Sequence, residues 1–157
     1  MAVDISTNKH IATFPSKVAS MMGQYGHVYN IVLQANADNG ILGARGDYVN
    51  FDQYEQDSVT ANAVEGKIIG QAATGNWYVE ITKLPATEVL YLYNSPVSEY
   101  EEREFQDEKL FYNKADEVVQ GAELKLGDVI EYSDEAFTGT AATGKAVKYA
   151  SGKYVVQ

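Results

Sequence analysis

Short stretches in which apolar and polar residues alternate recur along most of the chain. This period of two is typical of strands that bury one face in a core. The runs are rich in β-branched and aromatic residues, which strands favour, and Gly, Asn, Asp or Pro residues bound each of them. We therefore predict strands at residues 27–34, 48–51, 64–71, 77–82 and 89–93.

Three tight turns punctuate this pattern. They are an Asp-Asn-Gly turn at 38–40, a Gly-Asp turn at 127–128 and an Ala-Ser-Gly turn at 150–152. Such residues tolerate the positive φ values that tight turns demand, so each turn predicts a hairpin of antiparallel strands. The predicted hairpins join 27–34 to a run that starts at Ile41, 122–126 to 129–132, and 145–149 to 153–156.

The close spacing of these strands favours an all-β fold, since βαβ units would need helical crossovers. We predict an antiparallel barrel or sandwich of short strands, with room for a small α content. Residues 1–24 show no clean period and Pro15 interrupts them, so we predict an extended N-terminal arm there and a single β-rich domain at 25–157. A helical turn from Ser16 to Met22 and a helical or extended excursion at 95–114 stay open.

Composition narrows the range of partners. The formal net charge of the 157-residue chain is −10, and a field of that sign repels phosphate backbones, so we expect no direct contact with nucleic acid. The chain has no cysteine, which excludes disulfides and thiolate metal sites. Neither a secretory signal nor an apolar run of about 20 residues is visible, so we expect synthesis in a cytoplasm and no membrane partner.

Candidate catalytic chemistry is sparse. His10 and His27 are the only imidazoles, and neither falls in a triad, zinc, Walker or dinucleotide motif. We therefore expect no enzyme and assign no catalytic, cofactor-binding or metal-binding residue. One alternative is an acid–base hydrolase that uses two of the carboxylates at 99–104, although such a run is more often a solvated face.

Two short motifs have simpler interpretations. Asn36 to Gly40 resembles part of a calcium loop, but the third oxygen position falls on Gly40 and no bidentate Glu follows at the required distance. Arg45-Gly46-Asp47 is a tripeptide that some adhesion receptors bind. A glycine turn before the Tyr48 strand is the simpler explanation, and we favour it.

Aromatic residues leave two alternatives open. Tyr91 and Tyr93 alternate with Leu90 and Leu92, so the two rings are expected on one face of a strand. Exposed together with Trp77, they would form a platform for a sugar or a protein. Buried, they would form an ordinary face of a β-sheet.

Several segments together resemble the auxiliary capsid proteins, also called decoration or head-stabilising proteins, of tailed bacteriophages. The resemblance lies in the 38–40 turn followed by Gly-Asp-Tyr-Val at 46–49, in VLYLYNSP at 89–96, and in Leu-Gly-Asp-Val-Ile at 126–130. It spans about half of the chain and carries no site residue. It implies a virion structural protein on the capsid surface, which binds assembled major capsid protein and neighbouring copies of itself. A stand-alone carbohydrate- or protein-binding β-module is the alternative.

Overall fold

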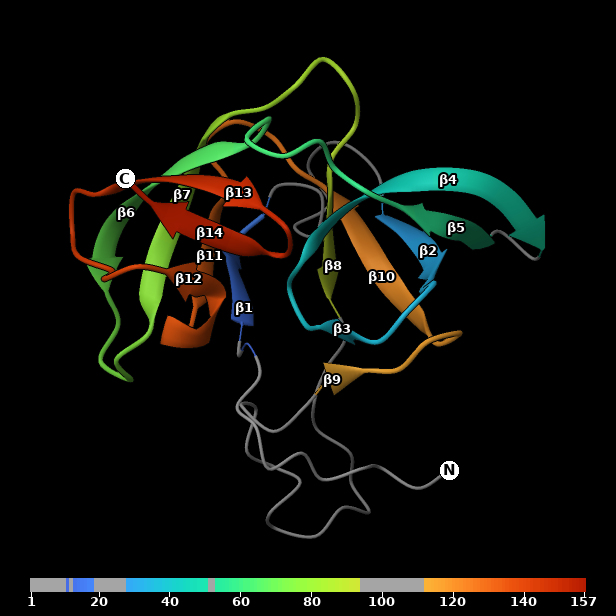
Figure 1. Cartoon of the computed structure of the whole chain (residues 1–157), viewed down its shortest axis with the longest axis horizontal. Coiled ribbons are helices and arrows are strands. Elements are labelled where there is room, and N and C mark those ends of the chain that lie inside the picture. Colours follow the sequence, from blue (N-terminus) through green and yellow to red (C-terminus); the bar gives the residue numbers. More distant parts are fainter. Residues whose placement is uncertain (1–10, 12, 19–27, 51–52, 94–111) are drawn as a thin grey trace, which may run out of the picture.

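The chain is almost entirely β-structure in the computed structural model, which describes residues 11, 13–18, 28–50, 53–93 and 112–157. The strands form a seven-stranded sheet, a closed barrel of five strands and a two-stranded ladder. Figure 1 shows the sheet on the left and the barrel on the right. The predicted all-β fold class is confirmed.

The larger sheet contains strands from both ends of the chain and from its middle. Its members are β1 (Thr13–Lys17), β6 (Glu65–Gln71), β7 (Trp77–Lys83), β11 (Val129–Tyr132), β12 (Phe137–Thr138), β13 (Ala146–Ala150) and β14 (Lys153–Val156). Their order across the sheet is β1-β11-β7-β6-β13-β14-β12. All neighbours are antiparallel except β12 and β14, and a short 3-10 helix, η4 (Asp134–Ala136), precedes β12.

The barrel closes on itself in the order β10-β2-β5-β4-β8, with β8 paired to β10. Its strands are β2 (Val28–Val32), β4 (Leu42–Asn50), β5 (Gln53–Asp57), β8 (Leu90–Tyr93) and β10 (Val118–Glu123). Strands β2 and β5 run parallel, whereas the other pairs are antiparallel. The ladder of β3 (Ala37–Asp38) and β9 (Tyr112–Asn113) lies beside the barrel.

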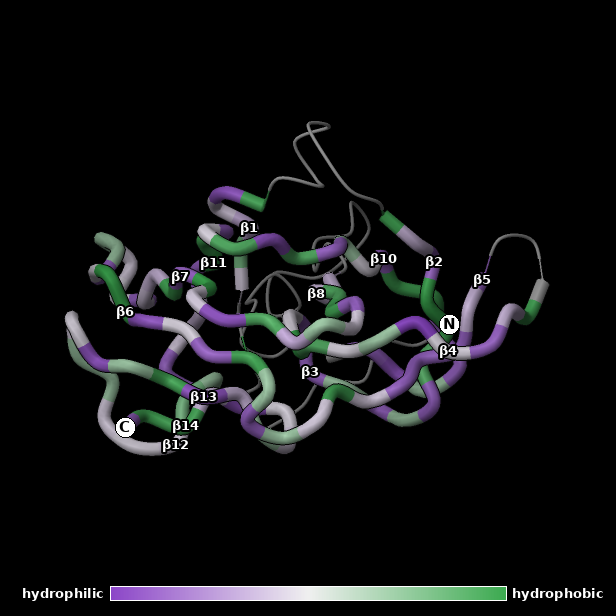
Figure 2. The backbone as a smooth tube through the Cα atoms, turned by 90° about the horizontal axis from the view of Figure 1, so that it is seen from above, coloured by the Kyte–Doolittle hydropathy of each residue, from purple (hydrophilic) through white to green (hydrophobic). Residues whose placement is uncertain are grey.

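Two separate hydrophobic cores result from this arrangement. The larger one lies between the sheet and the outer surface of the barrel, and the smaller one fills the barrel. Strand β8 contributes to both cores, because Leu90 and Leu92 point into the barrel while Tyr91 joins the larger core. The view from above in Figure 2 shows β8 between the sheet strands and β4. The alternation of Leu and Tyr in this strand therefore reflects burial of both faces.

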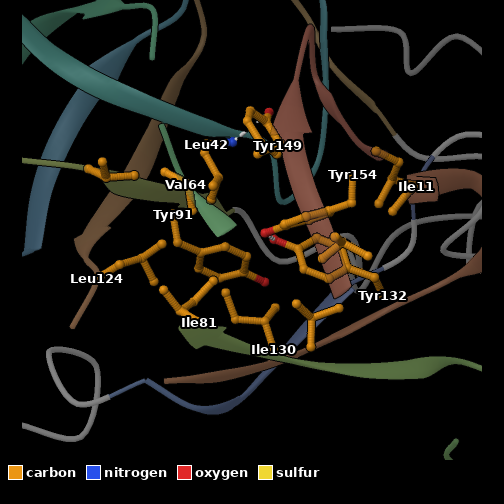
Figure 3. Close-up of a cluster of buried hydrophobic side chains, with 14 of the residues drawn as sticks. Ile11, Leu42, Val64, Ile81, Tyr91, Leu124, Ile130, Tyr132, Tyr149 and Tyr154 are labelled. Carbon is orange, nitrogen blue, oxygen red and sulfur yellow. Dashed lines mark hydrogen bonds between the residues drawn. The ribbon is translucent and has the colours of Figure 1, made fainter. Parts of the chain in front are cut away.

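Four buried tyrosines, which we call the tyrosine clamp, lie in the larger core (Figure 3). They are Tyr91, Tyr132, Tyr149 and Tyr154.

Two members of the clamp form a relay of hydrogen bonds to the barrel side. The Tyr154 hydroxyl donates to the Tyr132 oxygen at 3.1 Å, and Tyr132 donates to the carbonyl oxygen of Gly40 at 2.8 Å. Because a buried hydroxyl without a partner is costly, the relay allows both tyrosines to lie in an apolar core. Burial raises the pKa of each of them above its ordinary value.

The other two members bridge the sheet and the barrel directly. Tyr149 of β13 accepts a hydrogen bond from the backbone N–H of Leu42 in β4 at 2.9 Å. The hydroxyls of Tyr91 in β8 and Thr13 in β1 lie 2.8 Å apart, and Thr13 also donates to a backbone carbonyl of β11. Burial raises the pKa of Tyr149 to about 12, although the bond from Leu42 opposes the shift.

Local strand predictions agree with the structure better than the predicted pairings do. The strands expected at 64–71, 77–82 and 89–93 are β6, β7 and β8, and the 145–156 hairpin is β13 with β14. Its turn has positive φ at Ser151 (51°) and Gly152 (81°), as predicted. The strand expected at 27–34 is the shorter β2, the strand expected at 48–51 is the end of β4, and β5 was not anticipated.

The other two predicted hairpins are wrong. The turn at 38–40 forms with φ of 82° at Gly40, but β2 and β4 are not neighbours, since β5 lies between them. The turn at Gly127 also forms, with φ of 90°, yet β10 belongs to the barrel and β11 to the sheet. The first turn leads the chain from the ladder strand β3 to the barrel strand β4, and the second leads it from the barrel to the sheet. The prediction that all strands pair antiparallel is also wrong, because β12 with β14 and β2 with β5 are parallel.

Part of the expected N-terminal arm belongs to the sheet. Strand β1 lies at its edge, and the flanking residues Ile11 and Val18 are only 2% and 1% exposed in the larger core. An edge strand tolerates Pro15, which has no N–H to donate. Ser16 is a strand residue and not the cap of a helical turn. The rest of the arm, and residues 95–111 of the excursion expected at 95–114, lie outside the described residues.

Candidate functional site

One end of the barrel carries a group of aromatic and charged side chains, of which Tyr29 and Tyr54 also pack against the barrel core. We call it the barrel-end cluster and define it as Tyr29, Arg45, Tyr48, Tyr54 and Glu88. The residues come from β2, β4, β5 and the segment just before β8. The mouth of a β-barrel is a common place for a binding site, because side chains from several strands converge there.

A β-bulge in β4 brings two of these side chains to the same face. Arg45 pairs with Gln56 and Tyr48 pairs with Tyr54, so two residues of β4 lie opposite Glu55. The extra residue shifts the alternation, and Tyr48 therefore points to the same side as Arg45. Gly46 is required in the bulge, because a Cβ there would lie 2.9 Å from the backbone oxygen of Glu55.

The rings and the guanidinium group are in direct contact. Tyr54 packs edge-on against Tyr29, with centroids 5.7 Å apart, and against Tyr48, with centroids 5.4 Å apart. The Arg45 guanidinium carbon lies 4.2 Å from the centroid of Tyr29 and 4.9 Å from that of Tyr54. An ion pair of 3.4 Å between Arg45 Nε and Glu88 Oε1 completes the group. These contacts restrain Arg45, whose side chain is 33% exposed.

Two carboxylates at this end of the barrel, Glu88 and Glu123, each form an ion pair with a basic side chain. Burial, followed by the carboxylate of Glu88, raises the pKa of Tyr29, whereas the Arg45 cation opposes the shift. Glu123 at the end of β10 also raises that pKa and forms an ion pair of 3.0 Å with Lys125. Tyr29 is therefore a neutral hydroxyl at physiological pH.

A groove of about 430 Å³ adjoins the cluster. Residues 84–89 and 123–126, at the connections between the barrel and the sheet, form its walls, so Glu88 belongs to both the groove and the cluster. Leu126 on its rim is 66% exposed. In the cluster, Tyr48 is the exposed aromatic side chain, at 58%.

A second hollow, of about 340 Å³, lies between the barrel and the β13–β14 hairpin. Asp38, Gln56 and Lys153 are among the polar residues that line it. Within the described part of the chain, no three His, Asp or Glu side chains are close enough together to hold a metal ion.

The structure separates the aromatic residues that were expected to form one platform. Tyr91 is fully buried, and Trp77 is half-buried with its Nε1 donating to Asp134 at 2.8 Å. A platform of Trp77 and Tyr91 is therefore wrong, and the alternative of a buried sheet face is correct for Tyr91. The exposed aromatic surface lies instead at Tyr48, which the sequence pattern did not single out.

The two short motifs also have structural roles. Arg45 to Asp47 lie inside β4 at the bulge and not in a turn before a strand, so the predicted glycine turn is wrong. In the calcium-like segment, the Asn36 side-chain oxygen accepts from the N–H of Ala115 and is thus used within the fold. His10, His27 and the carboxylates at 99–104 lie outside the described residues.

Comparison with known proteins gives no relative for this chain. No protein-family model, no curated protein and no solved structure matches it. Across the segments that the structure describes, no helix is long and apolar enough to cross a membrane.

Proposed function

We propose that the protein is a virion structural protein, a capsid decoration protein that binds assembled major capsid protein through the barrel-end cluster. The observation that carries this proposal is the exposed Tyr48 ring beside a restrained arginine. Tyr and Arg are the side chains most enriched in the energetic centres of protein interfaces, where they combine a large contact area with hydrogen bonding. The resemblance of three sequence segments to phage auxiliary capsid proteins supports the same assignment.

The preorganisation of the cluster favours binding. Arg45 is held by two aromatic rings and a carboxylate, so its docking would cost little side-chain entropy. Tyr48 itself is 58% exposed, so its ring is available to a partner without rearrangement of the fold. The ion pairs at the rim favour specificity and orientation more than affinity.

The tyrosine clamp supports the proposal in a second way. A protein that bridges neighbouring capsid subunits must resist forces that pull on its two ends. Two hydrogen bonds connect the sheet to the barrel side, one donated by Tyr132 to the Gly40 carbonyl oxygen and one donated by the Leu42 N–H to Tyr149, so we expect the two parts to move as one body. Many copies, each spanning a subunit junction, would then raise the cost of separating the lattice.

Binding to particles tests the proposal. Mass spectrometry of purified virions of the encoding phage should find the chain in many copies, in fixed ratio to the major capsid protein. The Tyr48→Ala variant should bind particles that lack the protein roughly tenfold more weakly or worse, as loss of a central interface tyrosine does. Ile69→Ala, an exposed apolar change on the sheet, serves as the matched control and should bind normally. Absence of the chain from virions would exclude this function.

The exposed Tyr48 ring also supports a second candidate function, that of a stand-alone carbohydrate- or protein-binding module. A sugar that stacks on Tyr48 would bind the purified protein without any particle, and Tyr48→Phe would keep that binding while Tyr48→Ala would abolish it. Nuclear magnetic resonance titration with neutral mono- and disaccharides distinguishes this candidate. No shift at Tyr48, combined with binding to particles, would exclude sugar recognition at this ring.

A further inference from the structure

The turn at Asn39 and Gly40 lies where the barrel meets the sheet. The N–H of Gly40 donates to the carbonyl oxygen of Leu92 in β8 at 2.8 Å, and its own carbonyl oxygen accepts from Tyr132 of β11 at 2.8 Å. A Cβ at position 40 would lie 2.6 Å from the side chain of Thr13 in β1. One residue therefore contacts both parts of the molecule, and only glycine fits there with φ of 82°.

Asparagine followed by glycine is also chemically reactive, since glycine has no side chain to hinder attack by its backbone nitrogen. In the reaction, the deprotonated nitrogen of Gly40 bonds to Cγ of Asn39. The bond from Cγ to Nδ2 breaks, and ammonia leaves with a proton from water. Water then opens the resulting five-membered imide at either carbonyl and gives aspartate or isoaspartate at position 39.

The fold opposes each step of this reaction. The nitrogen that must attack has its N–H committed to Leu92. The Asn39 side chain is 2% exposed, and its oxygen faces the amide nitrogen of Asn113 at 3.4 Å. Attack requires both groups to move, and hydrolysis requires water at a buried position. In an open turn or an unfolded chain, none of these restraints remains.

We propose that Asn39 is a latent deamidation site, which reacts only when the turn separates from Leu92 and Tyr132. Deamidation at this position would therefore occur only in molecules whose barrel and sheet have separated, and it would prevent the two parts from packing together again. This proposal does not depend on the function proposed above.

Irreversibility follows from the geometry of the turn. Isoaspartate inserts one more carbon into the backbone just before Gly40, which must reach Leu92 and Tyr132 at the same time. Aspartate keeps the backbone length but leaves a carboxylate at a position that is 2% exposed, and burying a charge without a compensating partner is costly. Either product therefore weakens the junction between barrel and sheet.

Peptide mapping by mass spectrometry tests the proposal. The full chain is incubated at pH 8 with and without enough urea to unfold it, and the product at position 39 is followed over time. We expect native chains to react at least about tenfold more slowly, because reaction requires local opening. Equal rates in the two states, or no product at position 39 in the unfolded chain, would overturn the proposal.

A variant separates turn opening from global unfolding. Tyr132→Phe removes the donor to Gly40 and should raise the native rate severalfold, whereas Tyr78→Phe, on the sheet and outside the clamp, should leave it unchanged. Where Tyr132→Phe does not fold, wild type in urea below its unfolding transition replaces it, and its rate should rise with local opening. Reacted chains should regain the native fold in a smaller fraction than unreacted ones after urea is removed. Unchanged rates, or equal refolding, would contradict the proposal.

Discussion

The tyrosine clamp and the barrel-end cluster use the same side chain for opposite purposes. In the clamp the rings of Tyr132 and Tyr154 are buried and their hydroxyls are consumed by hydrogen bonds inside the core. In the cluster the rings of Tyr29 and Tyr54 contact Arg45, and the ring of Tyr48 is open to solvent. The difference shows that the tyrosine content of a strand-rich chain does not predict a binding surface, because the environment of each ring decides its role.

The largest expected effect is at the centre of the clamp. Tyr132→Ala leaves a cavity and removes two hydrogen bonds, so we expect the free energy of unfolding to fall by about 3–5 kcal/mol. Tyr132→Phe retains the ring and should cost about 1–3 kcal/mol, since the Gly40 oxygen loses its donor. Urea unfolding followed by tyrosine fluorescence measures both. Tyr48→Ala should change stability by less than about 0.5 kcal/mol. An equal loss for Tyr48→Ala and Tyr132→Ala would refute the contrast between the two regions.

The second largest effect is expected at alkaline pH, which should lower the contribution of the clamp to the free energy of unfolding. The pKa of Tyr149 is about 12 in the folded chain and close to its ordinary value of 10 in the unfolded chain. Because the folded value is the higher one, the stabilisation is complete below pH 10 and is lost as pH rises from 10 to about 12. The loss for this group amounts to about 3 kcal/mol over that range.

Unfolding measured at several pH values checks this prediction. Tyr149→Phe removes the titrating group, so its stability should fall less steeply above pH 10 than that of wild type. Ile69→Ala removes an exposed side chain that does not titrate, so it is the control and should leave the slope unchanged. A slope in Tyr149→Phe that equals the wild-type slope would show that this group does not titrate as the burial requires.

The smallest effect is expected inside the barrel-end cluster. A double-mutant cycle of Arg45→Ala and Tyr29→Leu should give a coupling energy of about 0.5–1 kcal/mol in unfolding experiments, as for an exposed cation–π contact. The same cycle with Arg45→Ala and Tyr78→Leu should give no coupling, because those residues lie on different parts of the molecule. No coupling between Arg45 and Tyr29 would mean that the cluster is not preorganised.

The sequence predicts strands better than it predicts their partners. Alternation and turn residues located β6, β7, β8 and the β13–β14 hairpin, because these features are local. Pairing across the barrel is set by contacts between distant segments, and no local pattern distinguishes a turn that closes a hairpin from one that leads to another sheet. The turn at Gly40 has the predicted conformation for this reason, although its predicted hairpin does not exist.

The candidate site was largely invisible in the sequence. Tyr48 and Arg45 are three residues apart, so strict alternation places them on opposite faces of a strand. Only the bulge at Gly46 brings them together, and a glycine in a strand is at most a hint of a bulge. Tyr91 attracted attention because it alternates with leucine, yet the second core on the other side of β8 buries it.

Strand β8 belongs to both cores, and this sharing limits how the protein can be divided or modified. Substitutions at Leu90 or Leu92 must fit the barrel core, and substitutions at Tyr91 must fit the larger core on the other side of the same strand. Removing the barrel would expose the inner hydrophobic face of the sheet to solvent, and removing the sheet would expose Tyr91. The two parts should therefore unfold in one cooperative transition, and neither is expected to serve as a transplantable module without the other.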